Sequence, residues 1–128
     1  MTHQELLTAD VIRTAVTNYL DAVSSGPSST IAALYAEDAT LEDPVGGEVR
    51  VGREAIEAFY GALDGVDCKT ELLTVRVSGN NAAFHFRVVT EIDGNAYAIE
   101  PIDVMTFDDR GAITSMRAYW SPTDMTEL

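Results

Sequence analysis

The sequence is poor in cysteine, in basic residues and in long apolar runs, and each shortage excludes a class of protein. Cys68 is the only cysteine among 128 residues, so no internal disulfide can form and no Cys/His set has the spacing of a zinc site. Lys and Arg number 8 against 21 acids, which gives a net charge of −13. Such a chain repels phosphate backbones and anionic lipid heads. We therefore expect no nucleic-acid partner and no membrane partner.

Signals for export or membrane insertion are also missing from the sequence. The first ten residues contain Glu5 and Asp10 and no basic segment ahead of an apolar run, unlike a secretory leader. No stretch approaches the roughly 20 apolar residues of a membrane helix. We expect a cytoplasmic protein. The length suits one domain, residues 1–128, with no linker and no internal repeat.

The N-terminal half has the apolar periodicity of helices. A one-faced stripe begins at Val11 and stops at SSGP, residues 24–27, where glycine favours a C-terminal cap and proline cannot continue the helix. Three helices are predicted, over residues 11–23, through Ile31, Leu34 and Tyr35, and over residues 56–63.

After Gly65 the apolar period changes to two, which is typical of strands. One strand should place Leu73, Val75 and Val77 on one face, and the motif DGN at 93–95 predicts a hairpin. Strands are predicted over residues 73–77, 84–92, 96–107 and 112–120. Helices followed by a meander indicate an α+β fold, with three N-terminal helices packed on one face of a curved antiparallel sheet.

Asp103 stands in an apolar pattern. By strand alternation its same-face neighbours include Ile99, Met105 and Phe107, so its carboxyl should be desolvated and its neutral form favoured. The alternative is a bulge at Pro101 that returns the carboxyl to water, since buried acids are uncommon.

Asp43 lies in the motif LEDPVGG, residues 41–47. Pro44 disfavours helix at the preceding residue, so Asp43 should end an extended segment and enter a turn. The alternative is an ordinary solvated turn acid, because Asp-Pro-x-Gly is a common turn composition.

Tyrosines occupy the apolar faces of all three predicted helices. Tyr19, Tyr35 and Tyr60 should point their rings to the interior, where a phenol needs a hydrogen-bond partner. They predict a polar network inside an apolar cavity, or else separate core tyrosines that bond to backbone groups.

Several motifs together resemble bacterial ketosteroid isomerases. They are LYAEDATLEDPVGGEVRVG at 34–52, AIEAFY at 55–60, PID at 101–103 and SMRA at 115–118. The similarity extends from about Val11 to Trp120, with one residue fewer around 63–67 than expected. Val104 and Met105 depart from the more polar or aromatic pair expected after Asp103. The segment 1–8 lies outside the match.

The resemblance implies a role for each matching residue. Asp43 matches the general base, and Tyr19 and Asp103 match the two hydrogen-bond donors of the oxyanion hole. Tyr60 and Tyr35 match supporting network tyrosines. The residues that match the apolar lining of the substrate pocket are Phe59, Phe84, Phe86, Met116 and Trp120.

The family's known chemistry then sets the expected function. A carboxylate moves a proton of a 3-oxo-Δ5-steroid from C4 to C6, and a neutral carboxylic acid helps to stabilise the intermediate dienolate. The family needs no cofactor and no metal. It has a cone-shaped fold of the nuclear-transport-factor-2 (NTF2-like, cystatin-like) type and is usually a homodimer.

Two other classes of function remain open on sequence grounds. One is a non-catalytic steroid- or lipid-binding domain of the same fold, because fold does not fix function. The other is a related polyketide cyclase, dehydratase or epoxide hydrolase. Dehydratase relatives would be expected to use a His–Asp pair, and epoxide hydrolase relatives an arginine between two acids. His85, Arg87 and Arg117 are predicted to face away from the pocket.

Overall fold

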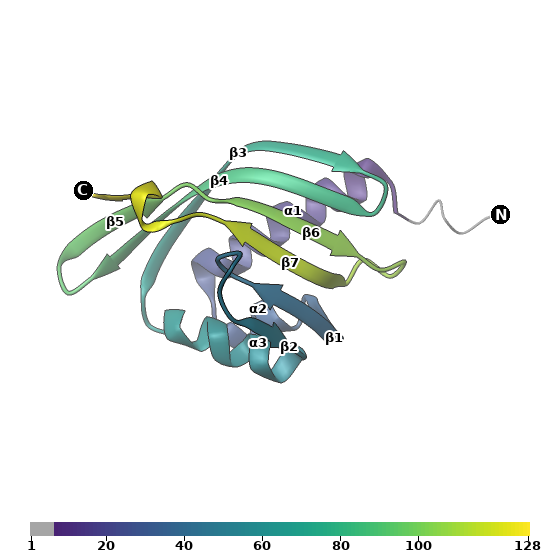
Figure 1. Cartoon of the computed structure of the whole chain (residues 1–128), viewed down its shortest axis with the longest axis horizontal. Coiled ribbons are helices and arrows are strands. Elements are labelled where there is room, and N and C mark those ends of the chain that lie inside the picture. Colours follow the sequence, from purple (N-terminus) through teal and green to yellow (C-terminus); the bar gives the residue numbers. More distant parts are fainter. Residues whose placement is uncertain (1–6) are drawn as a thin grey trace.

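The computed structural model describes residues 7–128, which form helices packed against one large sheet (Figure 1). The helices are α1 (Ala9–Ser25), α2 (Ser28–Ala32), α3 (Arg53–Tyr60) and the one-turn 3₁₀ helices η2 (Gly61–Leu63) and η3 (Pro122–Asp124). The strands are β1 (Tyr35–Glu42), β2 (Val49–Val51), β3 (Asp67–Ser78), β4 (Asn81–Ile92), β5 (Asn95–Ile99), β6 (Ile102–Phe107), β7 (Ile113–Tyr119) and β8 (Met125–Glu127). No helix within residues 7–128 is long and apolar enough to cross a membrane.

The eight strands form one curved sheet that is mainly antiparallel. The order is β2-β1-β7-β6-β4-β5-β8, and β3 pairs with β4. Only the β1–β7 pair is parallel within the described part of the chain. Figure 1 shows α1 and α2 behind the sheet and α3 beneath it, beside β1 and β2. The predicted α+β class is confirmed.

Helix α1 presents one side to this sheet. The N–H of Val11 donates to Oγ1 of Thr8 at 3.2 Å, which satisfies a backbone donor of the first turn. Gly26 ends the helix at φ 53°, a region that glycine enters without steric cost. Ile12, Val16 and Tyr19 are buried, as the apolar stripe predicts.

The second helix was predicted to reach Tyr35, and that prediction is wrong. Helix α2 ends at Ala32, and Tyr35 is the first residue of β1, opposite Ile113 of β7. The Ile113 N–H donates to the Leu34 carbonyl at 3.0 Å. The guanidinium of Arg53 also donates to the Tyr35 carbonyl, at 2.8 Å. The carbonyls of Leu34 and Tyr35 thus accept hydrogen bonds from residues outside the helix, and the helix does not continue through them.

The strand pattern also needs correction in places. The single strand predicted over 96–107 is divided into β5 and β6, because Pro101 has no N–H to offer a ladder. A register shift in β3 between Leu72 and Thr74 turns Leu73 outward, to 42% exposure, and Leu72 faces the core instead. Strands β2 and β8 were not predicted, and β1 was predicted only as an extended segment that ends at Asp43.

Candidate active site

An apolar cavity of about 280 Å³ lies between the helices and the inner face of the sheet. It gathers residues from α1, the turn after β1, α3, η2, the strands β3 to β7 and the segment after β7. Six polar side chains interrupt its wall, namely Tyr19, Asp43, Tyr60, Cys68, Thr90 and Asp103. The cavity therefore combines an apolar body with a few placed polar groups, as small-molecule sites do.

Asp103 is buried in the middle of β6. It pairs with Phe84 of β4 and Ala118 of β7, and its side chain is 1% exposed. The alternative of a bulge that returns it to water is therefore wrong. Its Oδ1 is buried with no hydrogen-bond partner within residues 7–128. Burial raises the pKa of the Asp103 carboxyl well above its usual value, and the charge of Asp43 raises it further. Burial thus favours the neutral form of Asp103, which lines the cavity.

Asp43 directly follows the last residue of β1, at the start of the predicted turn. The Val45 N–H donates to the Ala118 carbonyl at 2.8 Å, which fixes this turn against β7. The Gly46 N–H donates to Oε2 of Glu42 at 2.9 Å and closes the turn on itself. These hydrogen bonds hold the turn that places Asp43 at the cavity wall.

Two groups oppose the effect of burial on Asp43. The indole N–H of Trp120 donates to its Oδ1 at 2.6 Å, and the charge of Arg50 acts on it from nearby. Burial raises the pKa of the Asp43 carboxyl, while the Trp120 hydrogen bond and the Arg50 charge lower it, with a net rise. The rise is smaller than that of Asp103, so Asp43 is the acid that ionises first.

The three interior tyrosines form one chain of hydrogen bonds. Tyr60 Oη lies 2.8 Å from Tyr19 Oη and 2.6 Å from Tyr35 Oη. All three side chains are at most 4% exposed, and burial raises the pKa of each phenol well above its ordinary value. The three phenols therefore form a hydrogen-bonded network, which Tyr35 joins from β1 rather than from a helix. Their supporting role at the site stays a prediction.

The order of this chain leaves one proton for the cavity. Each phenol has a single O–H to donate. If Tyr35 donates to Tyr60 and Tyr60 donates to Tyr19, the Tyr19 proton is free to point at a ligand. Tyr19 is also the tyrosine of the three whose pKa is raised by the charges of both acids, Asp103 and Asp43.

The predicted apolar lining is divided between the wall and the core. Phe59, Phe86 and Trp120 line the cavity. Phe84 and Met116 do not line it and lie in the buried core instead. The Phe84 ring packs edge-on against Tyr19 at 6.3 Å between centroids, so it supports the donor rather than the ligand.

Sequence patterns missed two groups near Asp43. Trp120 was assigned only an apolar role, yet it donates to a carboxylate 77 positions earlier in the chain. Arg50, whose guanidinium stacks 4.6 Å above the Phe59 ring, was not assigned any role. The sequence offers no local signal for the Trp120 contact, since it depends on how β7 returns beside β1. Arg50 lies only a short way along the chain from Asp43, on β2, which pairs with β1.

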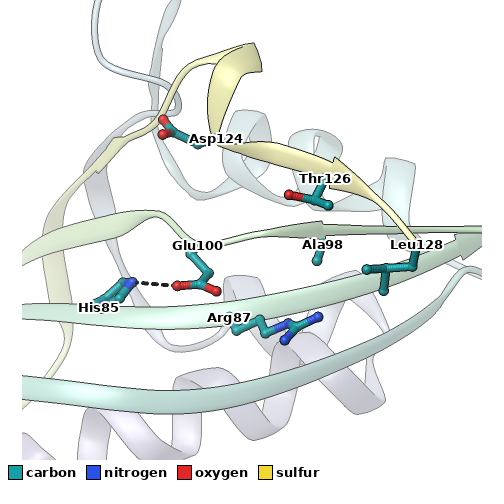
Figure 2. Close-up of a pocket in the computed structure, with 7 residues that line it drawn as sticks. All are labelled: His85, Arg87, Ala98, Glu100, Asp124, Thr126 and Leu128. Atoms are coloured by element: carbon teal, nitrogen blue, oxygen red, sulfur yellow. Dashed lines mark hydrogen bonds and ion pairs between the residues drawn. The ribbon is translucent and has the colours of Figure 1, made fainter.

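A second hollow, of about 500 Å³, lies on the outer face of the sheet under the C-terminal segment. Figure 2 shows its polar lining, with Nε2 of His85 at 3.1 Å from Oε1 of Glu100 and with Arg87 beside them. None of the predicted site residues lines this hollow. His85 and Arg87 thus face away from the apolar cavity, as expected from alternation along β4.

Comparisons with known proteins agree with this architecture. The model of the SnoaL-like domain family matches residues 16–116. The steroid Delta-isomerase of Nocardioides simplex is 60% identical over 114 residues, which cover 89% of this chain and 93% of that protein.

Two solved structures are similar in fold. The epoxide hydrolase/cyclase-like enzyme SalBIII, which has a role in pyran ring formation in the polyether salinomycin, superposes with a TM-score of 0.85 and 27% identity, covering 91% of this chain and 95% of that one. RV0760c from Mycobacterium tuberculosis gives a TM-score of 0.86 at 22% identity, covering 95% and 99%.

Proposed function

The chain belongs to the SnoaL-like domain family, and on this premise we propose that it is a steroid Δ-isomerase that converts 3-oxo-Δ5-steroids into 3-oxo-Δ4-steroids. One observation carries the proposal. Two acids of different expected charge state, Asp43 ionised and Asp103 neutral, line the same apolar cavity, and Tyr19 lines it with them. The similarity to the Nocardioides simplex isomerase supports it independently.

The reaction needs a base that takes up a carbon proton and returns it. The Asp43 carboxylate removes the proton from C4 of the substrate and delivers it to C6, so the double bond moves into conjugation with the ketone. The Trp120 indole holds one carboxylate oxygen, which leaves the other for the proton. Because burial raises the pKa of Asp43, its carboxylate is a stronger base than a solvated aspartate and still ionises before Asp103.

Between the two proton transfers the ketone oxygen carries dienolate charge. The Tyr19 hydroxyl and the neutral Asp103 carboxyl each donate a hydrogen bond to this oxygen. A donor of this kind is typically worth about 10²–10³ in rate in a water-excluding site. Asp103 can donate only while protonated, and its burial in β6 supports that state.

The experiment follows the conjugated enone by absorbance. Wild-type protein mixed with a 3-oxo-Δ5-steroid should produce the enone band. Asp43→Asn should lower the rate about 10²–10⁴-fold. Asp38→Asn is the matched control, since Asp38 is an exposed acid on β1 and should leave the rate unchanged. A folded wild-type protein that binds the steroid without turnover would instead support a non-catalytic binding domain.

Related reactions on this fold receive less support from the cavity. Dehydratase and epoxide hydrolase relatives would use a histidine or an arginine among the acids. The lining of this cavity, within residues 7–128, includes neither residue type. A proton transfer that uses carboxyl and hydroxyl groups alone suits the lining better.

The proposal includes a homodimer of single-domain chains. On the outer face of the sheet, Ile102 and Tyr119 pair across β6 and β7 and are 48% and 43% exposed. Exposed apolar side chains that adjoin on a sheet face are a feature of self-association surfaces. Light scattering of the wild-type protein should give twice the chain mass, and Ile102→Glu should lower it toward one chain.

We also place the reaction in the cytoplasm. Cys68 is buried and free, which suits a reducing compartment. Fractionation of the native cells tests this location.

A further inference from the structure

Glu42, the residue directly before Asp43, lies outside the apolar cavity. It is the last residue of β1 and pairs with Val49 of β2 and with Arg117 of β7. Because side chains alternate along a strand, the Glu42 side chain lies on the face of β1 opposite to that of the buried Leu41. Glu42 does not line the cavity, and the proposed mechanism gives it no part.

Both carboxylate oxygens of Glu42 accept hydrogen bonds. Oε2 accepts from the Gly46 N–H at 2.9 Å, and Oε1 accepts from Nε of Arg117 at 3.2 Å. The hydrogen bond from Gly46, followed by that from Arg117, lowers the pKa of the Glu42 carboxyl below its ordinary value. Glu42 is thus an anion whose side chain, at 18% exposure, joins the backbone of the turn to β7.

The end of β7 holds the turn that carries Asp43 at three levels. Inside the cavity, the Trp120 indole donates to the Asp43 carboxyl. In the backbone, the Ala118 carbonyl accepts an N–H of the turn. On the outer face, Arg117 donates to Glu42. The outer contact alone involves neither a cavity residue nor the Asp43 carboxyl, so its loss would move the base without removing any group that touches it.

The place of the base matters because the proposed reaction transfers a proton to and from carbon. Such a transfer needs the reacting atoms about 3–3.5 Å apart and aligned, and a misplacement of about 1 Å can cost about 10²-fold in rate. Trp120 fixes one oxygen of the Asp43 carboxyl, but the position of the whole side chain follows the backbone of the turn. Without Glu42, the Gly46 N–H loses its acceptor and the turn gains freedom.

We propose that Glu42 is a positioning residue for the general base, because its hydrogen bond to the Gly46 N–H, anchored on β7 by Arg117, holds the turn where Asp43 transfers the proton. This inference rests on the proposed isomerase function and adds a residue to its machinery. Glu42 contacts neither the substrate nor the Asp43 carboxyl, so it acts on kcat and not on substrate binding.

The test measures kcat and KM for a 3-oxo-Δ5-steroid by enone absorbance, at a pH high enough for Asp43 to be ionised in every variant. Rates are expressed per steroid-binding site, so that unfolded protein does not count. Glu42→Ala removes both hydrogen bonds and should lower kcat about ten- to hundredfold with KM nearly unchanged. Glu42→Gln keeps a carbonyl oxygen for the Gly46 N–H. It should retain kcat to within about threefold, because the ion pair that it loses is half exposed on the arginine side.

Glu37→Ala is the matched control. Glu37 is an exposed glutamate on the same strand, so its removal should leave kcat and KM unchanged. The proposal is overturned if Glu42→Ala retains the wild-type kcat, or if it raises KM and leaves kcat as it was. It is also overturned if Glu42→Gln loses as much rate as Glu42→Ala, since the charge and not the hydrogen bond would then be responsible.

Failure of the isomerase function itself gives a different result, because no variant then converts the steroid. The state of the turn is read instead from Trp120, the only tryptophan in the chain, whose indole contacts Asp43. Glu42→Ala should increase the quenching of its fluorescence by acrylamide, and Glu42→Gln and Glu37→Ala should not. Equal quenching in Glu42→Ala and wild type overturns the proposal.

Discussion

Asp43 and Asp103 face one cavity, but the surroundings of the two acids differ. Asp43 lies in a turn just beyond β1, where Trp120 donates to its carboxyl and the charge of Arg50 acts on it. Asp103 lies inside β6 between two neighbouring strands, and its Oδ1 has no partner in the described part of the chain. Burial raises the pKa of both acids, but only Asp43 has groups that oppose the rise. Thus donors and charges at the site, rather than burial alone, decide which acid can act as base and which as donor.

The largest effect is expected when the acid that we propose to be neutral, Asp103, is replaced by an apolar side chain. Asp103→Leu removes one oxyanion donor and should lower kcat about 10²–10³-fold, measured by enone absorbance. The same change should raise the melting temperature by several degrees, because it removes a buried polar group without a partner. A variant with wild-type turnover would exclude Asp103 from the mechanism.

The stability gain in Asp103→Leu should depend on pH in a defined direction. The unfolded chain releases the Asp103 proton above about pH 3.9, while the folded chain keeps it because its pKa is raised. The free energy of unfolding of the wild type therefore falls as pH rises through this window, by about 1.4 kcal/mol per pH unit for one proton. The Tm difference between the variant and wild type should widen from pH 4 upward. A constant difference would mean that Asp103 is ionised in the folded protein.

The environment of Asp103 could be predicted from sequence because it is local. Met105 and Phe107 follow at alternate positions of one strand, and this short-range alternation is enough to place Asp103 on the buried face. The stripe of α1 placed Tyr19 inward in the same way. Both predictions needed only the repeat of a single element.

The environment of Asp43 could not be predicted in this way. It depends on the parallel pairing of β1 with β7, which brings the segment after Tyr119 to the turn that contains Asp43. The same pairing makes Tyr35 a strand residue in place of a helical one. Contacts between residues far apart in the sequence are set by the whole sheet, and no local period encodes them.

A second test weakens the groups that keep Asp43 ionised. Trp120→Phe removes the hydrogen bond to the carboxylate, and Arg50→Met removes a nearby positive charge, so each should raise the Asp43 pKa further. The acid limb of the profile of kcat/KM against pH should move to higher pH in both variants. Well below that limb the rate should fall up to about tenfold for a shift of one unit, and above it the loss should be smaller.

Arg13→Met is the control for charge alone. Arg13 is a half-exposed arginine on α1 that pairs with Asp10 at 3.3 Å, far from the turn in sequence and on the solvent side of its helix. Its removal should leave the acid limb in place. If the limb also stays in place in Trp120→Phe and Arg50→Met, then a group other than Asp43 titrates in it.

The smallest expected effect concerns the chain of three tyrosines that orients the Tyr19 hydroxyl, the second proposed donor beside Asp103. Tyr60→Phe removes the hydroxyl between Tyr19 and Tyr35, so Tyr19 loses its donor and its own proton becomes less well directed. We expect a loss in kcat of about three- to tenfold, the value of one buried hydrogen bond, with KM nearly unchanged. Tyr35→Phe should cost less, because Tyr35 acts on Tyr19 only through Tyr60. If Tyr35→Phe lowers kcat more than Tyr60→Phe does, the hydrogen bonds are not ordered from Tyr35 toward the cavity, and Tyr19 must be oriented by another group.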